Sequence, residues 1–256
     1  MGITDNTRSI AAASVLLIGL WSHGAAAQAS NPNVLWQIVH DQCVPDRQQH
    51  RDPKPCAVVN LAGGFAVLKD IKGSTQFLLI PTMQISGIES PTLLAPFAAN
   101  YFADAWQARG LVEKALGHAM PPDMLSLAIN SDPGRTQNQL HIHIDCIRAA
   151  VRDALVSERP NIGWRWTVLK TPLAGHQYRA MRVTGPTLFG HNPFKLLAWG
   201  VPGARADMGQ HTLVVVGMVF NGRVPGFIIL DDRADLAHGN WGSGEELQDH
   251  ACALGH

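Results

Sequence analysis

The stretch that most constrains this chain runs from Leu140 to Ile147, where apolar and polar side chains alternate. A period of two is typical of a β-strand that buries one face in a core. One face would carry Leu140, Ile142, Ile144 and Cys146, and the other would carry His141, His143 and Asp145. The strand therefore predicts three titratable groups in a row, roughly 7 Å apart at successive sites.

The segment before this strand, residues 131–138, has the composition of a hydrogen-bonding loop. Asp-Pro-Gly near its start is turn chemistry, and Arg-Thr-Gln-Asn after it offers many donors. A donor-rich loop that leads into a strand with two imidazoles suits an anionic, phosphate-bearing substrate. The candidate substrate-binding residues are Asn130, Arg135, Thr136, Gln137 and Asn138. Arg135 is the candidate phosphate clamp, because a guanidinium binds two oxygens at once.

The charge balance argues against a nucleic-acid partner. The 256 residues carry 20 basic and 20 acidic side chains, so the formal net charge is zero and no broad basic field is expected. Apolar residues make up 46% and charged residues 16%, which fits a globular protein rather than one with several membrane spans. A chain of this length can hold one large domain or two small ones.

The N-terminus has the features of a secretory signal. Residues 10–21 are uncharged and largely apolar, they follow Arg8, and small residues around Ala27 and Ala29 then offer cleavage sites. The apolar run is shorter than the about 20 residues of a membrane span. Residues 1–30 therefore predict an export signal, with an uncleaved anchor as the alternative if the run extends through Ala27. In both cases the folded part lies outside the cytoplasm.

The four cysteines fit that compartment, because an exported chain tends to pair them. Cys43 and Cys56 bracket a proline-rich polar segment that has little else to order it. This favours a Cys43–Cys56 disulfide and leaves Cys146 for Cys252. Three pairings are possible for four cysteines, and the sequence leaves the alternatives open.

Residues 31–150 predict the element order β-β-α-β-β, an α+β arrangement in which helices cover an antiparallel sheet. The expected elements are a helix over 31–44 ended by Pro45, strands at 65–68 and 76–80, a helix over 96–117, a strand at 124–130 and then the histidine strand. This half carries the candidate catalytic residues.

Residues 151–256 repeat this order, which indicates a second half of the same unit. The expected elements are strands at 164–169 and 177–183, a helix over 192–208 broken at Pro202, a hairpin of 211–220 and 227–231, and a C-terminal helix over 244–254. In this half Phe227, Ile229 and Asp231 would take the places of the two histidines and Asp145. The second half would keep the sheet and lack the imidazoles, and an internal pseudo-dimer of this kind favours a monomer.

Two imidazoles on one strand face point to phosphorus chemistry. A neutral imidazole attacks phosphorus readily and leaves again, so it can split a pyrophosphate cleavage into two displacements. Donors fixed around the phosphate then stabilise the charge that spreads over its oxygens. His143, His141 and Asp145 are the catalytic candidates, and this chemistry calls for no metal and no cofactor.

These residues resemble the motif of the histidine-triad superfamily, His-φ-His-φ-His on a strand with a Gln four residues before the first His. Gln137 stands four residues before His141, and Asn130 stands eleven before it, where many members have an Asn. The closer similarity is to the CDP-diacylglycerol pyrophosphatases, a small exported branch of that superfamily. It covers nearly all of the chain after residue 31 and rests on the cysteine positions, the N-terminal apolar segment and several runs: Gln-Phe-Leu-Leu-Ile-Pro-Thr, Ala-Trp-Gln-Ala-Arg, Ser-Leu-Ala-Ile-Asn-Ser, Gly-Arg-Thr-Gln-Asn and His-Ile-His-Ile-x-Cys-Ile-Arg.

The resemblance implies a histidine-triad-like fold that hydrolyses the lipid substrate CDP-diacylglycerol to CMP and phosphatidate. It implies that His143 is the nucleophile and forms a CMP-histidine intermediate, while His141, Gln137 and Asn130 orient it or bind phosphate. It also implies work at a membrane surface in the periplasm, at or anchored to the inner membrane. Asp145 departs from the motif, which has a third His there. A carboxylate facing a diphosphate is unfavourable unless it is protonated or turned toward His143, whose tautomer it could then hold.

Two other classes of protein stay open at the level of sequence. His-x-His on a strand also supplies two zinc ligands, with Asp145 or a distant His as the third. Loss of activity on chelation, with rescue by zinc, would favour such a zinc-dependent hydrolase. The second alternative is a non-catalytic nucleotide or lipid-head-group binding module, on which no CMP could be trapped.

Overall fold

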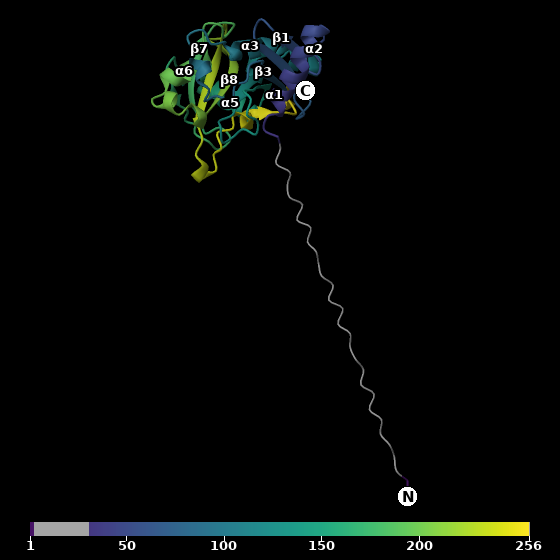
Figure 1. Cartoon of the computed structure of the whole chain (residues 1–256). Coiled ribbons are helices and arrows are strands. Elements are labelled where there is room, and N and C mark those ends of the chain that lie inside the picture. The colour runs from purple at the N-terminus through teal and green to yellow at the C-terminus, as the bar shows by residue number, and fades with distance from the viewer. Residues whose placement is uncertain (3–30, 256) are drawn as a thin grey trace. The chain divides into compact units, whose positions relative to one another are not determined.

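Ten strands within the described residues join in one antiparallel sheet (Figure 1). The computed structural model describes residues 1–2 and 31–255, and the architecture below is that of residues 31–255. The strands follow the order β1-β2-β3-β5-β4-β8-β9-β7-β6, and β10 pairs with β5 outside this path. Their bounds are β1 (Val58–Asn60), β2 (Phe65–Lys69), β3 (Phe77–Pro81), β4 (Leu125–Ile129), β5 (Ile142–Ile147), β6 (Thr167–Val168), β7 (Arg179–Thr184), β8 (His211–Phe220), β9 (Val224–Arg233) and β10 (Gln248–Asp249).

Helices cover this sheet, so the chain has the predicted α+β class. In residues 31–255 the α-helices are α1 (Val34–Ile38), α2 (Val44–Gln49), α3 (Tyr101–Ala108), α4 (Gly110–Leu116), α5 (Ala149–Glu158) and α6 (Pro193–Gly200). The predicted export signal or anchor over residues 1–30 lies almost wholly outside the described residues. Within the part that is described, no helix has the length and apolar character needed to cross a bilayer.

Apart from β1 at one edge, the strand order of the second half of the sheet mirrors that of the first half. In the first half the order is β2-β3-β5-β4, and in the second half, read from the other edge, it is β6-β7-β9-β8. Apart from β1 and β10, each half consists of two strands, a helical segment and two more strands. β4 and β8 join the halves through four residue pairs, from Ser126–Val216 to Ile129–Leu213.

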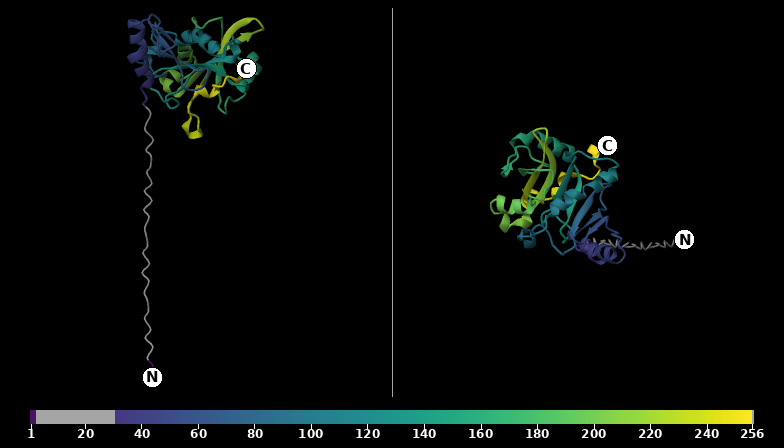
Figure 2. Two further views of the ribbon diagram at one scale, coloured as in Figure 1. Left: turned by 90° about the vertical axis from the view of Figure 1, so that its right-hand side faces the viewer. Right: turned by 90° about the horizontal axis from the view of Figure 1, so that it is seen from above.

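The two faces of the sheet are covered differently. On one face the strands pack against α3, α4 and α6, and Ile142 and Ile144 of β5 belong to this apolar cluster. On the other face α5 covers the second half, while α1 covers β2 and β3 at one end of the sheet (Figure 2). His143 pairs with Leu78 on one side and Ala128 on the other. Because those two neighbours belong to the two separate clusters of the second face, His143 lies between the two covers.

Both disulfides follow the predicted pairing, Cys43 with Cys56 and Cys146 with Cys252. The first joins the helical segment after α1 to the chain before β1. The second joins β5 to the segment that follows β10. The histidine strand is therefore covalently tied to the C-terminus of the chain.

Several helix boundaries differ from the sequence prediction. Pro45 does not end the first helix, because a π-helical turn over Val39–Cys43 leads into α2 and places Pro45 in its first turn, where a missing N–H costs little. The helix predicted over 96–117 begins only after Asn100, whose side chain accepts from the Ala103 N–H, and Arg109 divides it into α3 and α4. The sequence analysis also did not predict α5.

The C-terminal helix predicted over 244–254 is wrong. Gly244–Leu247 is a 3-10 turn, β10 follows, and Ala253–Gly255 is a second 3-10 turn. β10 pairs with Cys146 and Ile147 of β5, so the backbone groups of this segment bond to the histidine strand instead of to a helix.

The predicted correspondence between the halves is shifted by one residue. Phe227 and Ile229 share the apolar cluster of Ile142 and Ile144, so they lie on the face opposite His143. A row of paired residues instead runs across the sheet through His143, Ala128, Val214 and Leu230. Leu230 rather than Ile229 therefore lies in the same row of the sheet as His143.

Candidate active site

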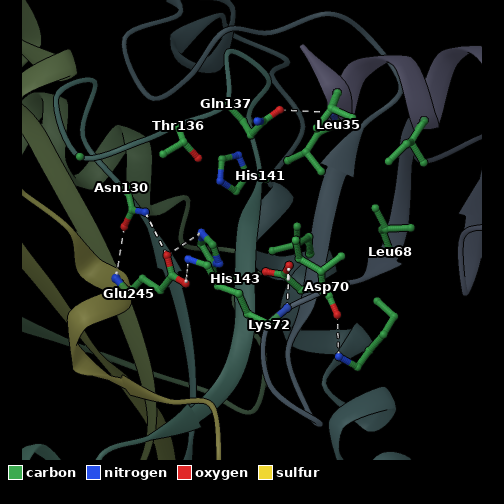
Figure 3. Close-up of a pocket in the computed structure, with 16 residues that line it drawn as sticks. Leu35, Leu68, Asp70, Lys72, Asn130, Thr136, Gln137, His141, His143 and Glu245 are labelled. Carbon is green, nitrogen blue, oxygen red and sulfur yellow. Dashed lines mark hydrogen bonds and ion pairs between the residues drawn. The ribbon is translucent and has the colours of Figure 1, made fainter. Parts of the chain in front are cut away.

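A cavity of about 330 Å³ opens over His143 on the second face of the sheet (Figure 3). Its walls come from α1, the loop after β2, the loop before β5 and the C-terminal turn Gly244–Leu247. One side is apolar, with Val34, Leu35, Ile38, Leu68, Ile71 and Leu78. The polar side includes Lys72, Asn130, Thr136, His141, His143 and Glu245. The cavity can therefore hold a ligand with a polar end and an apolar end.

The ring of His143 is anchored at one nitrogen and open at the other. Nδ1 is 2.5 Å from Nε2 of Gln76, a buried residue directly before β3. Nε2 is buried and has no hydrogen-bond partner among the described residues, and its nearest charged neighbour is Glu245 Oε2 at 3.6 Å. The ring is therefore held in place while one nitrogen is left for a ligand.

Gln76 can hydrogen-bond to either tautomer of His143, because turning over its side-chain amide places either the NH2 donor or the oxygen acceptor beside Nδ1. For attack on phosphorus the proton must be on Nδ1, so that Nε2 keeps its lone pair. The Gln76 amide, whose nitrogen faces Nδ1 in this structure and whose oxygen has no partner in the described residues, would then turn over to accept from Nδ1. Gln248 fixes the backbone of the same residue by donating to the His143 carbonyl oxygen at 3.3 Å. Two buried amides thus position one imidazole.

Both imidazoles of the strand are neutral at pH 7. Burial lowers the pKa of His143 to about 3, and repulsion from His141 adds to the shift. Burial also lowers the pKa of His141, whose Nδ1 donates to the Gln139 carbonyl oxygen at 2.7 Å. The ring centroids are 4.9 Å apart in an edge-to-face arrangement. A neutral imidazole is the nucleophilic form.

Glu245 supplies the carboxylate nearest to His143, and the sequence analysis missed it. Its backbone N–H donates to Asn130 Oδ1 at 3.2 Å, Asn130 Nδ2 donates to its Oε2 at 3.4 Å, and Lys72 Nζ lies 3.2 Å from its Oε1 (Figure 3). Burial raises the pKa of Glu245, but the hydrogen bond with His250 and the charge of Lys72 contribute to a larger downward shift. The pKa of Glu245 is therefore well below its ordinary value, and the carboxylate is ionised.

Asp145 turns toward His250 and not toward His143. Its Oδ2 accepts from His250 Nδ1 at 2.8 Å, and its Oδ1 accepts from Thr75 Oγ1 at 2.7 Å. The Asp145 side chain is fully buried and is not among the residues that line the cavity. This orientation removes the electrostatic conflict between Asp145 and a diphosphate that the sequence raised.

Thr136 and Gln137 of the predicted binding loop line the cavity, as do Asn130 and His141. Gln137 Oε1 accepts from the Leu35 N–H at 3.3 Å, so it joins the loop to α1. The structure thus brings these residues together with His143 around one cavity.

Arg135 and Asn138 are not among the residues that line this cavity. Arg135 donates to both carboxylate oxygens of Glu89 at 2.7 and 2.9 Å, and it lies 2.7 Å from Asp132. Its side chain is 7% exposed. The guanidinium is therefore engaged in ion pairs that hold the loop, and it is not presented to a phosphate.

Three potential metal ligands come together away from the histidine strand. Among the described residues His176, Asp232 and Glu246 place one ligand atom each within 4.8 Å of one another. In the same part of the chain, His141 and His143 do not belong to such a group.

Sequence reasoning missed Gln76, Glu245 and His250, which lie far from the motif along the chain. Gln76 is 67 residues from His143, and His250 is 105 residues from Asp145. One signal could have located His250, because the predicted Cys146–Cys252 disulfide brings the residues around 252 to the end of the histidine strand. No comparable signal pointed to Gln76.

Comparisons with known proteins cover both halves of the sheet. A family model described as CDP-diacylglycerol pyrophosphatase matches residues 30–256. A CDP-diacylglycerol pyrophosphatase from Yersinia pestis is 45% identical over 225 residues, which is 88% of this chain and 86% of that protein. Among solved structures, a DUF4931 family protein from Bacillus cereus ATCC 10987 is similar with a TM-score of 0.43 and 11% identity, over 70% of this chain and 84% of that one.

Proposed function

The chain belongs to the CDP-diacylglycerol pyrophosphatase family, and we propose that His143 cleaves the substrate by forming a CMP-histidine intermediate. The chain is an enzyme of phospholipid metabolism that hydrolyses the pyrophosphate bond of CDP-diacylglycerol. The observation that supports this nucleophile is the Nε2 atom of His143, buried beside the cavity without a hydrogen-bond partner in residues 31–255. An unpaired buried nitrogen is costly, and a reacting phosphorus atom would give it a partner.

The proposed reaction has two displacements on one phosphorus atom. In the first, Nε2 of His143 bonds to the phosphorus next to cytidine, the bond to the bridging oxygen breaks, and its electron pair stays on phosphatidate. In the second, the oxygen of a water molecule attacks the same phosphorus, and the nitrogen–phosphorus bond breaks to release CMP. Throughout, the Gln76 amide, turned so that its oxygen accepts a hydrogen bond from Nδ1–H, would hold the ring in the nucleophilic tautomer.

In the proposed complex, an anionic oxygen of the substrate takes the place where the Glu245 carboxylate now lies. Its ionised carboxylate lies beside Asn130 Nδ2, Lys72 Nζ and His143 Nε2. A diphosphate at that place would be repelled by the carboxylate. The proposal therefore includes displacement of the Glu245 side chain by the substrate, whose phosphate oxygens then bind Asn130 and Lys72.

The two ends of the substrate would each meet apolar residues that line the cavity. The apolar wall of Val34, Leu35 and Ile38 supports a place for the cytidine base against α1. The diacylglycerol would leave past Ile71, which is 99% exposed and stands next to Lys72. An exposed isoleucine beside a lysine suits an anionic lipid surface.

The two disulfides indicate an exported protein. The proposal places the enzyme in the periplasm, at or anchored to the inner membrane, where a lipid substrate is available. The N-terminal signal or anchor over residues 1–30 is part of this proposal.

We also propose that the sheet is a duplicated histidine-triad-like unit, with one half over residues 31–150 and the other over 151–256. The mirrored strand order supports it. With the Ala128–Val214 pair as the centre, His143 corresponds to Leu230 and Asp145 to Asp232. The strands of the second half would keep the sheet without counterparts of His141 and His143, and the β4–β8 junction would replace a subunit interface, so the chain would act as a monomer.

Trapping of labelled CMP tests the nucleophile. Mixing the enzyme with CDP-diacylglycerol labelled in the cytidine, followed by an alkaline denaturing quench that preserves N–P bonds, should leave label on the native chain and none on His143→Ala. His238→Ala is the matched control, because this exposed histidine contacts only Asp235 within the hydrogen bonds of the described residues, and it should retain the label. Normal turnover by a folded His143→Ala variant would contradict the assignment.

A further inference from the structure

His250 is fixed beside the histidine strand by the C-terminal segment. β10, which directly precedes it, pairs with the end of β5, and the Cys146–Cys252 disulfide follows two residues after it. Gly73 packs against the backbone of His250, since a Cβ at Gly73 would lie 2.5 Å from the His250 carbonyl oxygen. The position of the imidazole therefore follows from strand pairing, a covalent bond and a close backbone contact.

Asp145 sets the orientation of the ring. His250 Nδ1 donates to Asp145 Oδ2 at 2.8 Å, and Asp145 is itself held by Thr75 Oγ1 at 2.7 Å and by the Cys146 N–H at 2.9 Å. Because both carboxylate oxygens are engaged in a buried site, the ring cannot rotate without breaking a buried hydrogen bond. Nε2 of His250 is therefore directed away from Asp145.

The carboxylate of Glu245 bridges His250 and His143. Its Oε1 lies 3.3 Å from His250 Nε2, and its Oε2 lies 3.6 Å from His143 Nε2. One small anionic group thus faces a ring nitrogen from each of two imidazoles. A phosphate that displaces this carboxylate would meet the same two nitrogens.

We propose that His250 is a second catalytic imidazole, whose Nε2–H donates to the bridging oxygen of the diphosphate while His143 attacks the neighbouring phosphorus. The inference deepens the proposed function and rests on its CMP-histidine route. The histidine strand presents no acid at this place, because Asp145 faces His250 and not the cavity. The acid is supplied instead from a segment 105 residues further along the chain.

The protons of the two steps balance. As the bond between phosphorus and the bridging oxygen breaks, its electron pair stays on that oxygen, which takes the Nε2 proton of His250 and leaves as hydrogen phosphatidate. His250 is then neutral. In the second step it accepts one proton of the attacking water, the resulting hydroxyl group stays on phosphorus, and the electron pair of the N–P bond returns to His143. Both imidazoles end in their starting protonation states.

The charges around His250 suit this role. Asp145 faces it from β5, Glu245 faces it from the turn before β10, and Lys72 Nζ approaches the same Glu245 oxygen as His250 Nε2. Hydrogen bonds with Asp145 and then Glu245 raise the pKa of His250 to about 9, although burial opposes them. The ring is therefore protonated at pH 7, and a diphosphate in place of Glu245 would keep it so.

The experiment compares His250→Gln with the native enzyme in rapid-quench trapping of CMP and in steady-state hydrolysis across pH. Because general acid catalysis contributes roughly 10²- to 10⁴-fold, the rate of CMP-enzyme formation should fall at least about 100-fold in His250→Gln. The native kcat should fall as pH rises through about 9, where His250 loses its proton, and the small residual kcat of His250→Gln should lack this fall. KM should change much less than kcat.

His118→Gln is the matched control, because His118 also holds the C-terminal segment, through Gly255, but its ring contacts the carbonyl oxygens of Ala119 and Gly255 and not the Glu245 carboxylate that His250 meets. Its kcat and pH profile should match those of the native enzyme. Native rates and an unchanged alkaline fall in folded His250→Gln would overturn the inference. If that variant does not fold, the pH profile of Asp145→Asn tests the inference instead. Removal of the carboxylate that positions His250 should move the alkaline fall in kcat to lower pH. An unmoved profile would overturn the inference.

The test separates this inference from the nucleophile assignment. If the native enzyme traps no CMP, both the intermediate and the role of His250 fail. If the native enzyme and His250→Gln trap CMP at equal rates, the intermediate stands and the assignment of His250 is overturned.

Discussion

At the scale of single residues, the carboxylate of Glu245 stands where the substrate's phosphate is proposed to bind. It is ionised and has hydrogen-bonding or charged partners on both oxygens. In the proposed complex, a substrate breaks these contacts before it reaches His143. Glu245 would therefore hold the polar side chains of the site together and oppose binding at the same time.

Glu245→Gln should lower KM for CDP-diacylglycerol by about 3- to 10-fold, because it removes one like charge from a partly buried site. kcat at pH 7 should stay within about threefold. The alkaline fall in kcat/KM should move to lower pH, since Glu245 is one of the two groups that raise the pKa of His250 in the free enzyme. Initial rates over substrate concentration and pH, with inorganic phosphate as a competitive inhibitor, measure all three effects. A higher KM in the variant would show that the carboxylate does not stand in the place of the phosphate.

Sequence reasoning found the residues that the chain presents locally and missed those that tertiary contacts bring in. His141 and His143 are readable because alternation along one strand fixes which face each side chain takes. Arg135 looked like a phosphate ligand, but its partner Glu89 is 46 residues away and no local pattern reveals the pair. The same limit hid Glu245, which reaches the cavity only through the fold of the C-terminal segment.

At the scale of elements, strands were predicted better than helices. β2, β3, β4, β5, β8 and β9 lie where alternating or continuous apolar runs placed them. The C-terminal segment looked helical by composition but became β10, because β5 offers it a strand edge and a disulfide partner. Local propensity is a weak preference that such long-range contacts override.

The disulfide beside β10 should matter for catalysis as well as stability. It closes a loop of 106 residues, so replacing both Cys146 and Cys252 by Ser should cost about 4 to 5 kcal/mol in the chain-entropy estimate. It should also lower kcat, since His250 loses its covalent anchor. Denaturant unfolding and steady-state rates on the folded variant check both effects.

The Cys43–Cys56 bridge provides the control. It closes a separation of 13 residues, so its removal should cost about 3 kcal/mol and leave kcat nearly unchanged. Equal losses of kcat in the two double variants would show that the bridge at Cys146 acts only through stability.

At the scale of the whole molecule, two histidines with opposite pKa shifts should set the pH of greatest stability. The folded pKa of His250 is raised from 6.5 to about 9, so its stabilisation is complete below pH 6.5 and is lost as pH rises through about 9. The folded pKa of His143 is lowered from 6.5 to about 3, so burying its neutral ring costs nothing above pH 6.5 and destabilises the protein increasingly as pH falls toward 3. Together they predict a maximum near pH 6.5.

Thermal unfolding from pH 4 to 10 measures this curve. In His250→Gln the decline of Tm between pH 6.5 and about 9 should be reduced, while the acid limb should be unchanged. An alkaline limb identical to that of the native protein would contradict the assigned shift of His250.

The two adjacent glutamates of the turn Gly244–Leu247 contact different halves of the sheet. Glu245 reaches the histidine strand, while Glu246 accepts from Tyr178 Oη and lies 2.8 Å from His176 Nδ1 in the half whose strands lack counterparts of His141 and His143. A fragment cut at residue 150 would therefore lose Glu245 and His250 and would uncover the edge of β4 that now pairs with β8. The second half supplies both the strand edge that pairs with β4 and the C-terminal segment that carries Glu245 and His250, so the enzyme cannot be shortened to its motif.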